Sequence, residues 1–464
     1  MSLAEFLGGH ALACTIAGST CGRDALSPDE LLNQLKKVGL ETLGPGKDSR
    51  DSLTILFRRT AEALSPAARR AWSALTFAGA NRTPLQFLHA LEVTDRAPLT
   101  ELVQLGIAKT SRAPSPETGD EEPAYALAHS LLSEWGRTAL ADYGIERGKV
   151  LVKAMVWAME YGGKFLEHPE EHCRPAQYAI VAPIADAILH EVEPRADITV
   201  GALSRFYHLT ARIHMHHGQF ALAEPIYRRC EARMKPDAGE SSSKYAVALS
   251  NLAQLLQTTN RLAEAEPLMR RALEIFKAIY GESHPNVATQ LNNLAHLLQA
   301  TNRLAEAEPL MRRALEIDEQ SYGESHQRMA IRLNNLAALL QTTNRLAEAE
   351  PLMRCALAID EQSYGKSHPD VARDLGNLAR LLQATNRLAE AKPMMRRMAI
   401  IILQFTVQTG YPHPHLRTAL RSYAVLCEEM KVPEEEFWLR LLGMCRAAGM
   451  DDETAKKILA SAFQ

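Results

Sequence analysis

The sequence has few aromatic residues and no long run of apolar residues. Phe, Trp and Tyr together make up 6% of the 464 residues, whereas hydrophobic residues make up 46%. So few aromatic side chains among many Leu, Ala, Arg and Glu suit close-packed helices better than sheets. The longest apolar runs, such as the one near residue 400, fall short of the ~20 residues that a membrane span needs. We therefore expect a mainly α protein without a membrane span.

The sequence also lacks an excess of charge and a paired pattern of cysteines. The 52 Lys and Arg residues nearly balance the 55 Asp and Glu residues, so no overall field would recruit nucleic acid or an anionic membrane. The seven cysteines are scattered without a CxxC pair, which favours reduced thiols in a cytoplasmic protein. No basic segment precedes the apolar residues at the N-terminus, so no cleavable signal is expected.

Motifs for catalysis or nucleotide binding are missing as well. The segment ETLGPGKDS contains Gly46 and Lys47 of a phosphate-binding loop, but Glu41 and Asp48 replace the Gly and the Ser or Thr that the loop needs. A linker between helical segments is the simpler interpretation. No Ser/His/Asp, Cys/His or paired-carboxylate arrangement stands out, so we predict neither enzyme activity nor a cofactor.

One segment recurs with a 42-residue period along the second half of the chain. Four asparagines follow this period, each within a copy of TNRLAEAEPLMRRALEI or a degenerate form of it: Asn260, Asn302, Asn344 and Asn386. A fixed period of this size is typical of stacked helix pairs. In one copy, apolar residues at helical spacing indicate a first helix that includes 287–300, with Leu294 in its interior, and a second helix that includes 304–317.

The residues between these helices fit this interpretation. Asn302 can adopt the left-handed conformation that ends the first helix, and Gly323 can end the second. Pro285 and Pro369 would begin the next helix in their copies, at a position where proline is favoured. Pro309 is expected near the end of a first turn, where the lost amide costs little. Each repeat therefore predicts two antiparallel helices.

Small residues also recur where two helices must approach closely. In one repeat they are Ala295, Ala307 and Ala314. With the run LNNLA…N/G-R-x-x-EA…RRAL…YGxxHP, this pattern resembles the tetratricopeptide repeat, specifically the 42-residue variety of the kinesin light chain. The resemblance is specific over about 245–400, and degenerate copies extend it to about six units over 201–442. It implies an α-solenoid, with 443–464 as a capping helix that covers the last apolar face.

The N-terminal third differs from the repeats. Short helices, with Ser27 and Ser65 as caps, precede two predicted strands on either side of the polar turn APSPETGDEEP. Helices followed by a β-ribbon make a small winged-helix-like α+β unit over about 52–143. Residues 1–51 are expected to form a helical remnant, and 144–200 a helical connector to the repeats.

The N-terminal segments resemble the carboxy-terminal half of an NB-ARC-type (STAND) signalling ATPase, a nucleotide-dependent switch. LGGHALACTIAG is similar to that family's GLPLAL helix, with Ala11 in place of its proline, and YALAHSLLSEWGR looks like its MHD segment. The resemblance implies that His129 senses the β-phosphate of a nucleotide, with Ser130 where an Asp is expected. The nucleotide-binding half would lie before Met1, which implies a nucleotide-binding partner subunit.

Two further signals concern nucleic acid and metal. The winged-helix interpretation raises DNA binding, but the segment TDRAPLTELVQLG has one Arg beside an Asp and a Glu, and phosphate binding needs several cations. Nucleic acid is therefore not an expected partner. His214 and His217 would share a helix face, as metal ligands can. Because His214 aligns with the apolar Leu256 of the next repeat, packing is favoured and no metal is predicted.

The most informative polar residues lie in the first helix of each repeat. In the resembled family this face lines the concave groove, and a row of carboxamides, which both donate and accept, suits an extended peptide main chain. The residues that vary beside this row could recognise the side chains of the bound peptide. Alternatively, each asparagine bonds the neighbouring helix as a spacer. The candidates are Asn251, Asn293, Asn335 and Asn377, then Gln254, His296 and Arg380, and more weakly Gln257, Gln299, Gln341 and Gln383.

We therefore expect a non-enzymatic, cytoplasmic interaction protein. It would bind a peptide or protein in the groove of its repeats and relay occupancy to the N-terminal unit. The alternative is the sensor half of a STAND-type ATPase whose nucleotide-binding half is missing or encoded separately.

Overall fold

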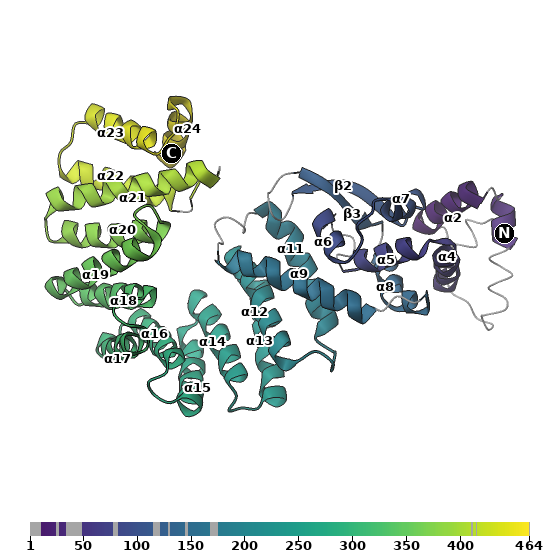
Figure 1. Ribbon diagram of the computed structural model, residues 1–464, viewed down its shortest axis with the longest axis horizontal. Helices are drawn as coiled ribbons and strands as arrows, with labels where there is room; N and C mark the ends of the chain where they lie inside the picture. Colours follow the sequence, from purple (N-terminus) through teal and green to yellow (C-terminus); the bar gives the residue numbers. More distant parts are fainter. Residues whose placement is uncertain are drawn as a thin grey trace. The chain divides into compact units, whose positions relative to one another are not determined.

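The computed structural model of the protein is mainly helical, as the composition predicted (Figure 1). The structure describes residues 11–24, 27–33, 49–77, 82–114, 121–128, 130–143, 147–167, 175–409, 412–413 and 415–463. The chain divides into two compact units, Met1–Cys230 and Glu231–Gln464. The domain boundaries expected from the sequence stay predictions.

The N-terminal unit contains a small sheet among short helices. The helices are α2 (Ala11–Asp24), α4 (Ser49–Ala63), α5 (Pro66–Leu75), α6 (Leu85–Ala90), α7 (Ala97–Gln104) and α8 (Ser130–Ala139), followed by the 3-10 helix η1 (Leu140–Tyr143). The strands are β1 (Thr83–Pro84), β2 (Ala108–Pro114) and β3 (Glu121–Leu127). They form an antiparallel sheet of order β1-β3-β2. Strands β2 and β3 are the predicted pair, whereas the two residues of β1 were not predicted.

Two contacts hold this unit's helices in place. Ser65 caps α5 by accepting from the Ala68 amide at 3.1 Å, and its hydroxyl donates to a Glu101 oxygen of α7 at 2.7 Å. The cap predicted at Ser65 is therefore confirmed, and it also joins two helices. The buried indole of Trp72 donates to the Leu132 carbonyl at 3.0 Å and stacks on Trp135 at 5.0 Å between ring centroids.

Four longer helices follow in the same part of the chain. They are α9 (Arg147–Glu167), α11 (Pro175–Val192), α12 (Val200–His216) and α13 (Phe220–Ala238), and the boundary between the two units falls within α13. His214 of α12 is 2% exposed. Its Nδ1 lies 3.0 Å from the Tyr178 hydroxyl and its Nε2 lies 3.0 Å from an Asp186 oxygen. Both ring nitrogens have partners, so His214 is a packing residue, as its alignment with Leu256 predicted.

The C-terminal unit is a stack of helix pairs, visible in order from α14 to α23 in Figure 1. The pairs are α14 (Ser243–Thr258) with α15 (Leu262–Tyr280), α16 (Pro285–Ala300) with α17 (Leu304–Tyr322), α18 (Gln327–Thr342) with α19 (Leu346–Tyr364), α20 (Pro369–Ala384) with α21 (Leu388–Thr409), and α22 (Leu416–Glu429) with α23 (Glu434–Ala447). The last helix, α24 (Asp452–Phe463), packs on α22 and α23.

The turn residues take the conformations that the sequence predicted. The four asparagines between paired helices have φ angles of 61°, 59°, 58° and 59° at Asn260, Asn302, Asn344 and Asn386. Gly323 ends α17 with a φ of 82°. One detail of α17 was wrong: Pro309 is its sixth residue rather than part of its first turn, whereas the predicted helix end at Gly323 is confirmed. The helix tolerates this proline because only one backbone bond is lost on an exposed face.

A histidine caps the first helix of three successive repeats, a feature that the sequence did not predict. The Nδ1 atoms accept from the backbone amides two residues later at 3.1, 3.2 and 3.2 Å in His284, His326 and His368. A tyrosine at the end of the preceding helix stacks on each ring, with centroid distances of 4.5, 4.6 and 4.3 Å for Tyr280, Tyr322 and Tyr364. Each pair therefore fixes the turn between repeats.

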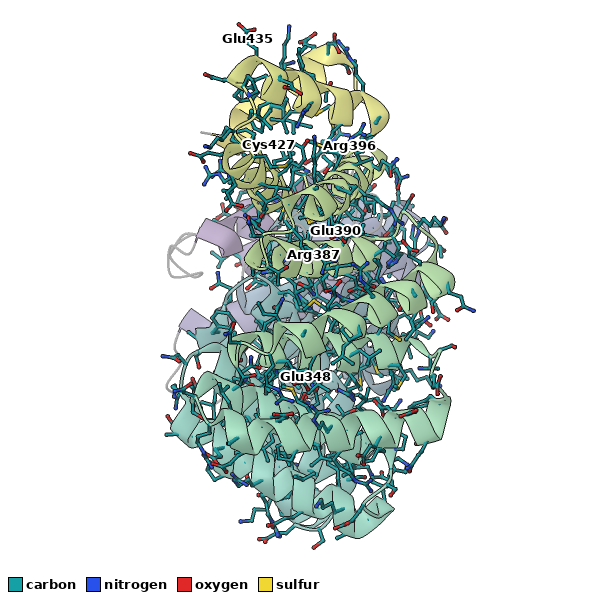
Figure 2. The ribbon with its side chains drawn as sticks, turned by 90° about the vertical axis from the view of Figure 1, so that its left-hand side faces the viewer. Glu348, Arg387, Glu390, Arg396, Cys427 and Glu435 are labelled. Carbon is teal, nitrogen blue, oxygen red and sulfur yellow. The ribbon has the colours of Figure 1, made fainter. Side chains whose placement is uncertain are left out.

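A row of ion pairs joins the repeats along their second helices. Arg345 donates to both oxygens of Glu308 in the preceding repeat, at 2.9 and 2.8 Å, and to Glu348 of its own repeat at 2.6 Å. Arg312 also contacts Glu308, at 2.8 Å. Arg303 makes the equivalent contacts with Glu266 and Glu306, and Arg387 makes them with Glu350 and Glu390. Glu348, Arg387 and Glu390 of this row are labelled in Figure 2.

The apolar run near residue 400 is part of the core. Within α21, Ala399, Ile401 and Leu403 are each at most 3% exposed. No helix in the described part of the chain is both long and apolar enough to span a membrane.

Candidate binding groove

A groove of about 550 Å³ crosses the first helices of three successive repeats. Its lining includes four of the predicted site residues: Gln299 of α16, Gln341 of α18, and Asn377 and Arg380 of α20. Ala338 of α18 also lines it, at the repeat position that Arg380 occupies in α20. The 42-residue period brings these side chains together because equivalent positions of stacked helices face the same side.

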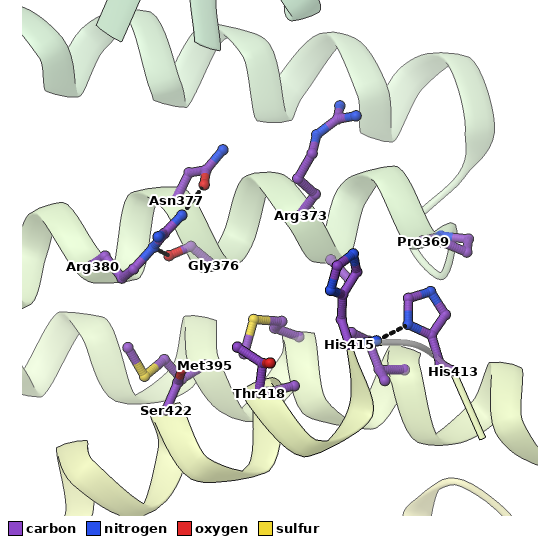
Figure 3. Close-up of a pocket in the computed structure, with 14 residues that line it drawn as sticks. Pro369, Arg373, Gly376, Asn377, Arg380, Met395, His413, His415, Thr418 and Ser422 are labelled. Carbon is purple, nitrogen blue, oxygen red and sulfur yellow. Dashed lines mark hydrogen bonds between the residues drawn. The ribbon is translucent and has the colours of Figure 1, made fainter. Parts of the chain in front are cut away.

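A second cavity of about 340 Å³ adjoins this groove between α20, α21 and α22. It shares Asn377 and Arg380 with the groove (Figure 3). Apolar side chains of Met395, Met398 and Ile402 form part of its lining. Polar groups complete the wall: Arg373, His413, His415, Thr418 and Ser422. The lining includes two arginines and no acidic residue.

Arg380 is the cation shared by the two cavities. Its side chain is exposed, and it donates to the Asn377 side-chain oxygen and, at 3.4 Å, to the Gly376 carbonyl (Figure 3). It forms no ion pair within the ranges that the structure describes. A guanidinium held by neutral acceptors keeps donors available for a ligand.

The histidines near the groove favour their neutral forms. Burial, followed by the neighbouring charge of His415, lowers the pKa of His413 to about 4. His413 Nδ1 also accepts from the His415 amide at 3.1 Å. Burial, followed by the charge of Arg332, lowers the pKa of His296. His413 is therefore neutral near pH 7, and its pocket gains no charge from it.

The four asparagines of the predicted ladder differ in their surroundings. All four are half-buried. The Asn335 amide donates to Asn292 of the neighbouring first helix at 3.1 Å, which is the spacer role. Asn377 instead accepts from Arg380. Among the described contacts, Asn251 and Asn293 make no side-chain hydrogen bond.

Seven predicted residues line neither of these two cavities: Asn251, Asn293, Asn335, Gln254, His296, Gln257 and Gln383. Gln254 is exposed on α14, and Gln257 and His296 are half-buried. Gln383 donates to a Glu429 oxygen of α22 at 2.6 Å. The carboxamide of Gln383 is therefore already engaged within the unit.

Sequence reasoning missed the part of the second cavity that α21 and α22 supply. His415, Thr418 and Ser422 lie where the repeat pattern is degenerate, so no equivalent positions marked them. The two histidines of YPHPH, His413 and His415, were a usable signal that the repeat pattern alone does not single out. The nucleotide-sensing residue implied at His129 lies outside the described residues.

Comparison with known proteins gives one family match. The sequence model of the tetratricopeptide repeat matches residues 203–278, 244–320, 286–362 and 328–398. A search among curated proteins gives no match.

Several solved structures resemble the chain. BtubC (BKLC) from P. vanneervenii is 24% identical, covers 56% of this chain and 93% of its own, and has a TM-score of 0.41. The nearly identical TPR-like repeats of a protein named for the kinesin light chain, from Podosopora anserina, are 22% identical, cover 42% of this chain and 93% of their own, and have a TM-score of 0.38.

The third is a signal transduction ATPase with numerous domains and a tetratricopeptide repeat sensor, from Pyrococcus horikoshii. It is 12% identical, covers 97% of this chain and 74% of its own, and has a TM-score of 0.43. The helix pairs, their 42-residue period and the family match agree. Residues 203–398 are therefore an array of tetratricopeptide repeats.

Proposed function

We propose that this protein is a scaffold or sensor that binds an extended peptide or protein segment in the groove across α16, α18 and α20. Tetratricopeptide repeats imply protein–protein interaction, and the groove is the more specific part of the proposal. The observation that carries it is the convergence of Gln299, Gln341, Asn377 and Arg380 on one cavity.

The chemistry of these side chains suits a peptide main chain. An extended segment presents alternating amide donors and carbonyl acceptors, and a carboxamide can satisfy both. Gln299 and Gln341 come from helices of successive repeats, so their spacing is set by the stack. Because packed helices hold the lining, little conformational entropy is lost when a segment binds. A volume of about 550 Å³ is within the range of common ligand sites.

The asparagine row supports a narrower role than the sequence suggested. Asn335 already bonds Asn292, so a ligand would have to compete with that bond. We assign the ligand contacts to the glutamines, Asn377 and Arg380. Asn293 would extend the site toward α14 without such competition.

A peptide library displayed on phage, selected on the intact chain, tests the proposal. Enriched peptides are then titrated by fluorescence anisotropy against the double variant Gln299→Ala, Gln341→Ala. Each lost hydrogen bond weakens binding by ~0.5–1.5 kcal/mol, so the pair predicts roughly a 5- to 150-fold loss of affinity.

The matched control replaces two exposed glutamines of the second helices, Gln320→Ala with Gln362→Ala. It should bind the peptides like the wild type, and both variants should melt near the wild-type temperature. Equal losses in the two variants, or none in either, would contradict the groove assignment.

Relay of occupancy to the N-terminal unit belongs to the same proposal. The resemblance of residues 1–143 to the end of a STAND ATPase supports it, and it also supports the second candidate, a sensor half that acts with a nucleotide-binding subunit. Hydrogen exchange in 52–143, measured with and without a selected peptide, tests the relay. Unchanged exchange rates in 52–143 at saturating peptide would contradict the relay.

A further inference from the structure

Three joints between successive repeats carry different residues at equivalent positions. We define a joint as the contact of the second helix of one repeat with the first helix of the next. Each helix contributes one position, and both positions recur with the 42-residue period. They hold Phe276 and Gln290 at the first joint, Asp318 and Arg332 at the second, and Asp360 and Asp374 at the third.

The second joint contains a buried ion pair. Arg332 Nε donates to an Asp318 oxygen at 2.8 Å, and the two side chains are 8% and 0% exposed. Arg332 also donates to the Thr289 hydroxyl at 3.2 Å. Opposite charges therefore compensate each other at this joint, which offsets the cost of burying them.

The third joint places an acid where the second has its arginine. Asp360 of α19 is 2% exposed and Asp374 of α20 is 0% exposed. Asn334 of α18 donates to one Asp374 oxygen at 2.8 Å. The other oxygen is buried and accepts no hydrogen bond from an amide, a hydroxyl or a guanidinium. Ionising both of two buried carboxylates at one contact carries a high free-energy cost.

The charged groups around the pair do not neutralise it. Arg373 is 45% exposed, and it reaches Asp360 at 3.2 Å, Asp374 at 3.3 Å and Asp370 at 2.7 Å. One solvated cation is thus divided among three acids. Of these three acids, His368 pairs with Asp370 alone, at 3.4 Å.

The other packed helices add no compensating charge. Tyr364 of α19 is a titratable group near enough to interact with Asp360, and it carries no positive charge. Helix α18 presents the neutral Asn334 to Asp374. Helix α21 presents Met398 to Gly376 of α20. Within the described ranges, no cation of α18 or α21 pairs with either carboxyl.

We propose that the third joint holds one proton between Asp360 and Asp374, and that loss of this proton loosens the contact of α19 with α20. The electrostatics agree: burial, followed by the charge of Asp374, raises the pKa of Asp360 to about 7, and burial also raises the pKa of Asp374. The folded joint therefore keeps a proton that the unfolded chain loses near pH 4.

The sign of the pH dependence follows from linkage. Between about pH 4 and pH 7 the folded joint binds more protons than the unfolded chain, so its stability falls as pH rises. The loss is complete above the raised pKa of Asp360. The joint should thus be tightest in mild acid and loosest above neutral pH.

The groove would sense this change, a consequence that rests on the proposed function. Helix α20 carries Asn377 and Arg380, and α18 carries Gln341. A looser joint would disturb the spacing of these groups, and a bound segment would be held less tightly at pH 8 than at pH 6.

Hydrogen exchange of the intact chain tests the joint directly. The measured quantity is the protection factor of the α20 amides, which corrects for intrinsic exchange, in the wild type and in Asp360→Asn. Between pH 5 and pH 7 the wild-type factor should fall relative to that of the variant by up to about tenfold per pH unit. Above about pH 8 the protection factors of the two proteins should change with pH in parallel. Parallel profiles over the whole range would overturn the proposal.

The matched control is Asp318→Asn at the second joint. It removes one partner of a buried ion pair, so the protection factors of the α18 amides should be lower than in the wild type at every pH. The ratio of the two proteins' protection factors should not change with pH. If Asp360→Asn does not fold, Asp374→Arg, which rebuilds the residue pair of the second joint, is measured instead. A wild-type profile parallel to that of Asp374→Arg would equally overturn the proposal.

Peptides selected on the groove separate the two proposals. A pH-dependent joint with no peptide binding contradicts the proposed function alone. Peptide binding with a pH-independent joint contradicts the proton site alone.

Discussion

At the scale of single residues, buried leucines at one repeated position hold each helix pair together. Leu294 is 2% exposed, and its equivalents Leu252, Leu336 and Leu378 are at most 3% exposed. Leu294→Ala should lower the free energy of unfolding by ~2–5 kcal/mol because it leaves a cavity in a packed interior. Urea denaturation measures the change. Ile331→Ala, at a side chain 47% exposed, is the control and should cost under ~1 kcal/mol; equal costs would contradict the helix phase.

Spacing predicted which residues face the interior but not which polar groups meet there. The burial of Leu294 follows from helical periodicity alone. The bond from Asn335 to Asn292 and the pairing of Asp360 with Asp374 depend on how far two helices are offset, which no local pattern encodes. Of the candidate site residues, the structure separates Gln299 and Gln341, which line one cavity, from Gln383, which bonds Glu429. Their role in binding stays a prediction.

At the scale of elements, the histidine caps set where each first helix begins. His326 Nδ1 accepts from the Arg328 amide, and its ring stacks on Tyr322. His326→Ala should lower the free energy of unfolding by ~0.5–2 kcal/mol, whereas His326→Asn, which can still accept at the cap, should lose less. Urea denaturation at pH 7 compares the three proteins. Identical values for the two variants would mean that ring stacking, not the cap, matters.

The elements themselves were largely predictable because turn chemistry recurs with the repeats. Asn302 and Gly323 marked the helix ends, since few other residues adopt a positive φ at low cost. Strand β1 was missed because its two residues carry no periodicity, and only pairing with β3 defines them.

At the scale of the whole molecule, near-identical repeats are joined by both uniform and distinct contacts. The arginine row, such as Arg345 with Glu308 and Glu348, is the same between three pairs of successive repeats. The row is partly exposed, so each pair adds only a few tenths of a kcal/mol to about 1 kcal/mol. The buried joint pairs differ from repeat to repeat. Distinct interiors make each repeat fit its own neighbours best, which disfavours misregistered stacking of similar units.

The last helix should protect the end of this array. Helix α24 covers α22 and α23: Leu459 is 4% exposed, Phe463 contacts the ring of Trp438, and the Ser461 carbonyl accepts from Arg417 at 2.6 Å. Deleting residues 452–464 should expose an apolar face, so hydrogen exchange in α22 and α23 should accelerate and the chain should self-associate in light scattering. Exchange in α14–α17 should not change, because each repeat is stabilised mainly by its immediate neighbours. Uniform acceleration from α14 to α23 would mean that the array unfolds as one cooperative unit.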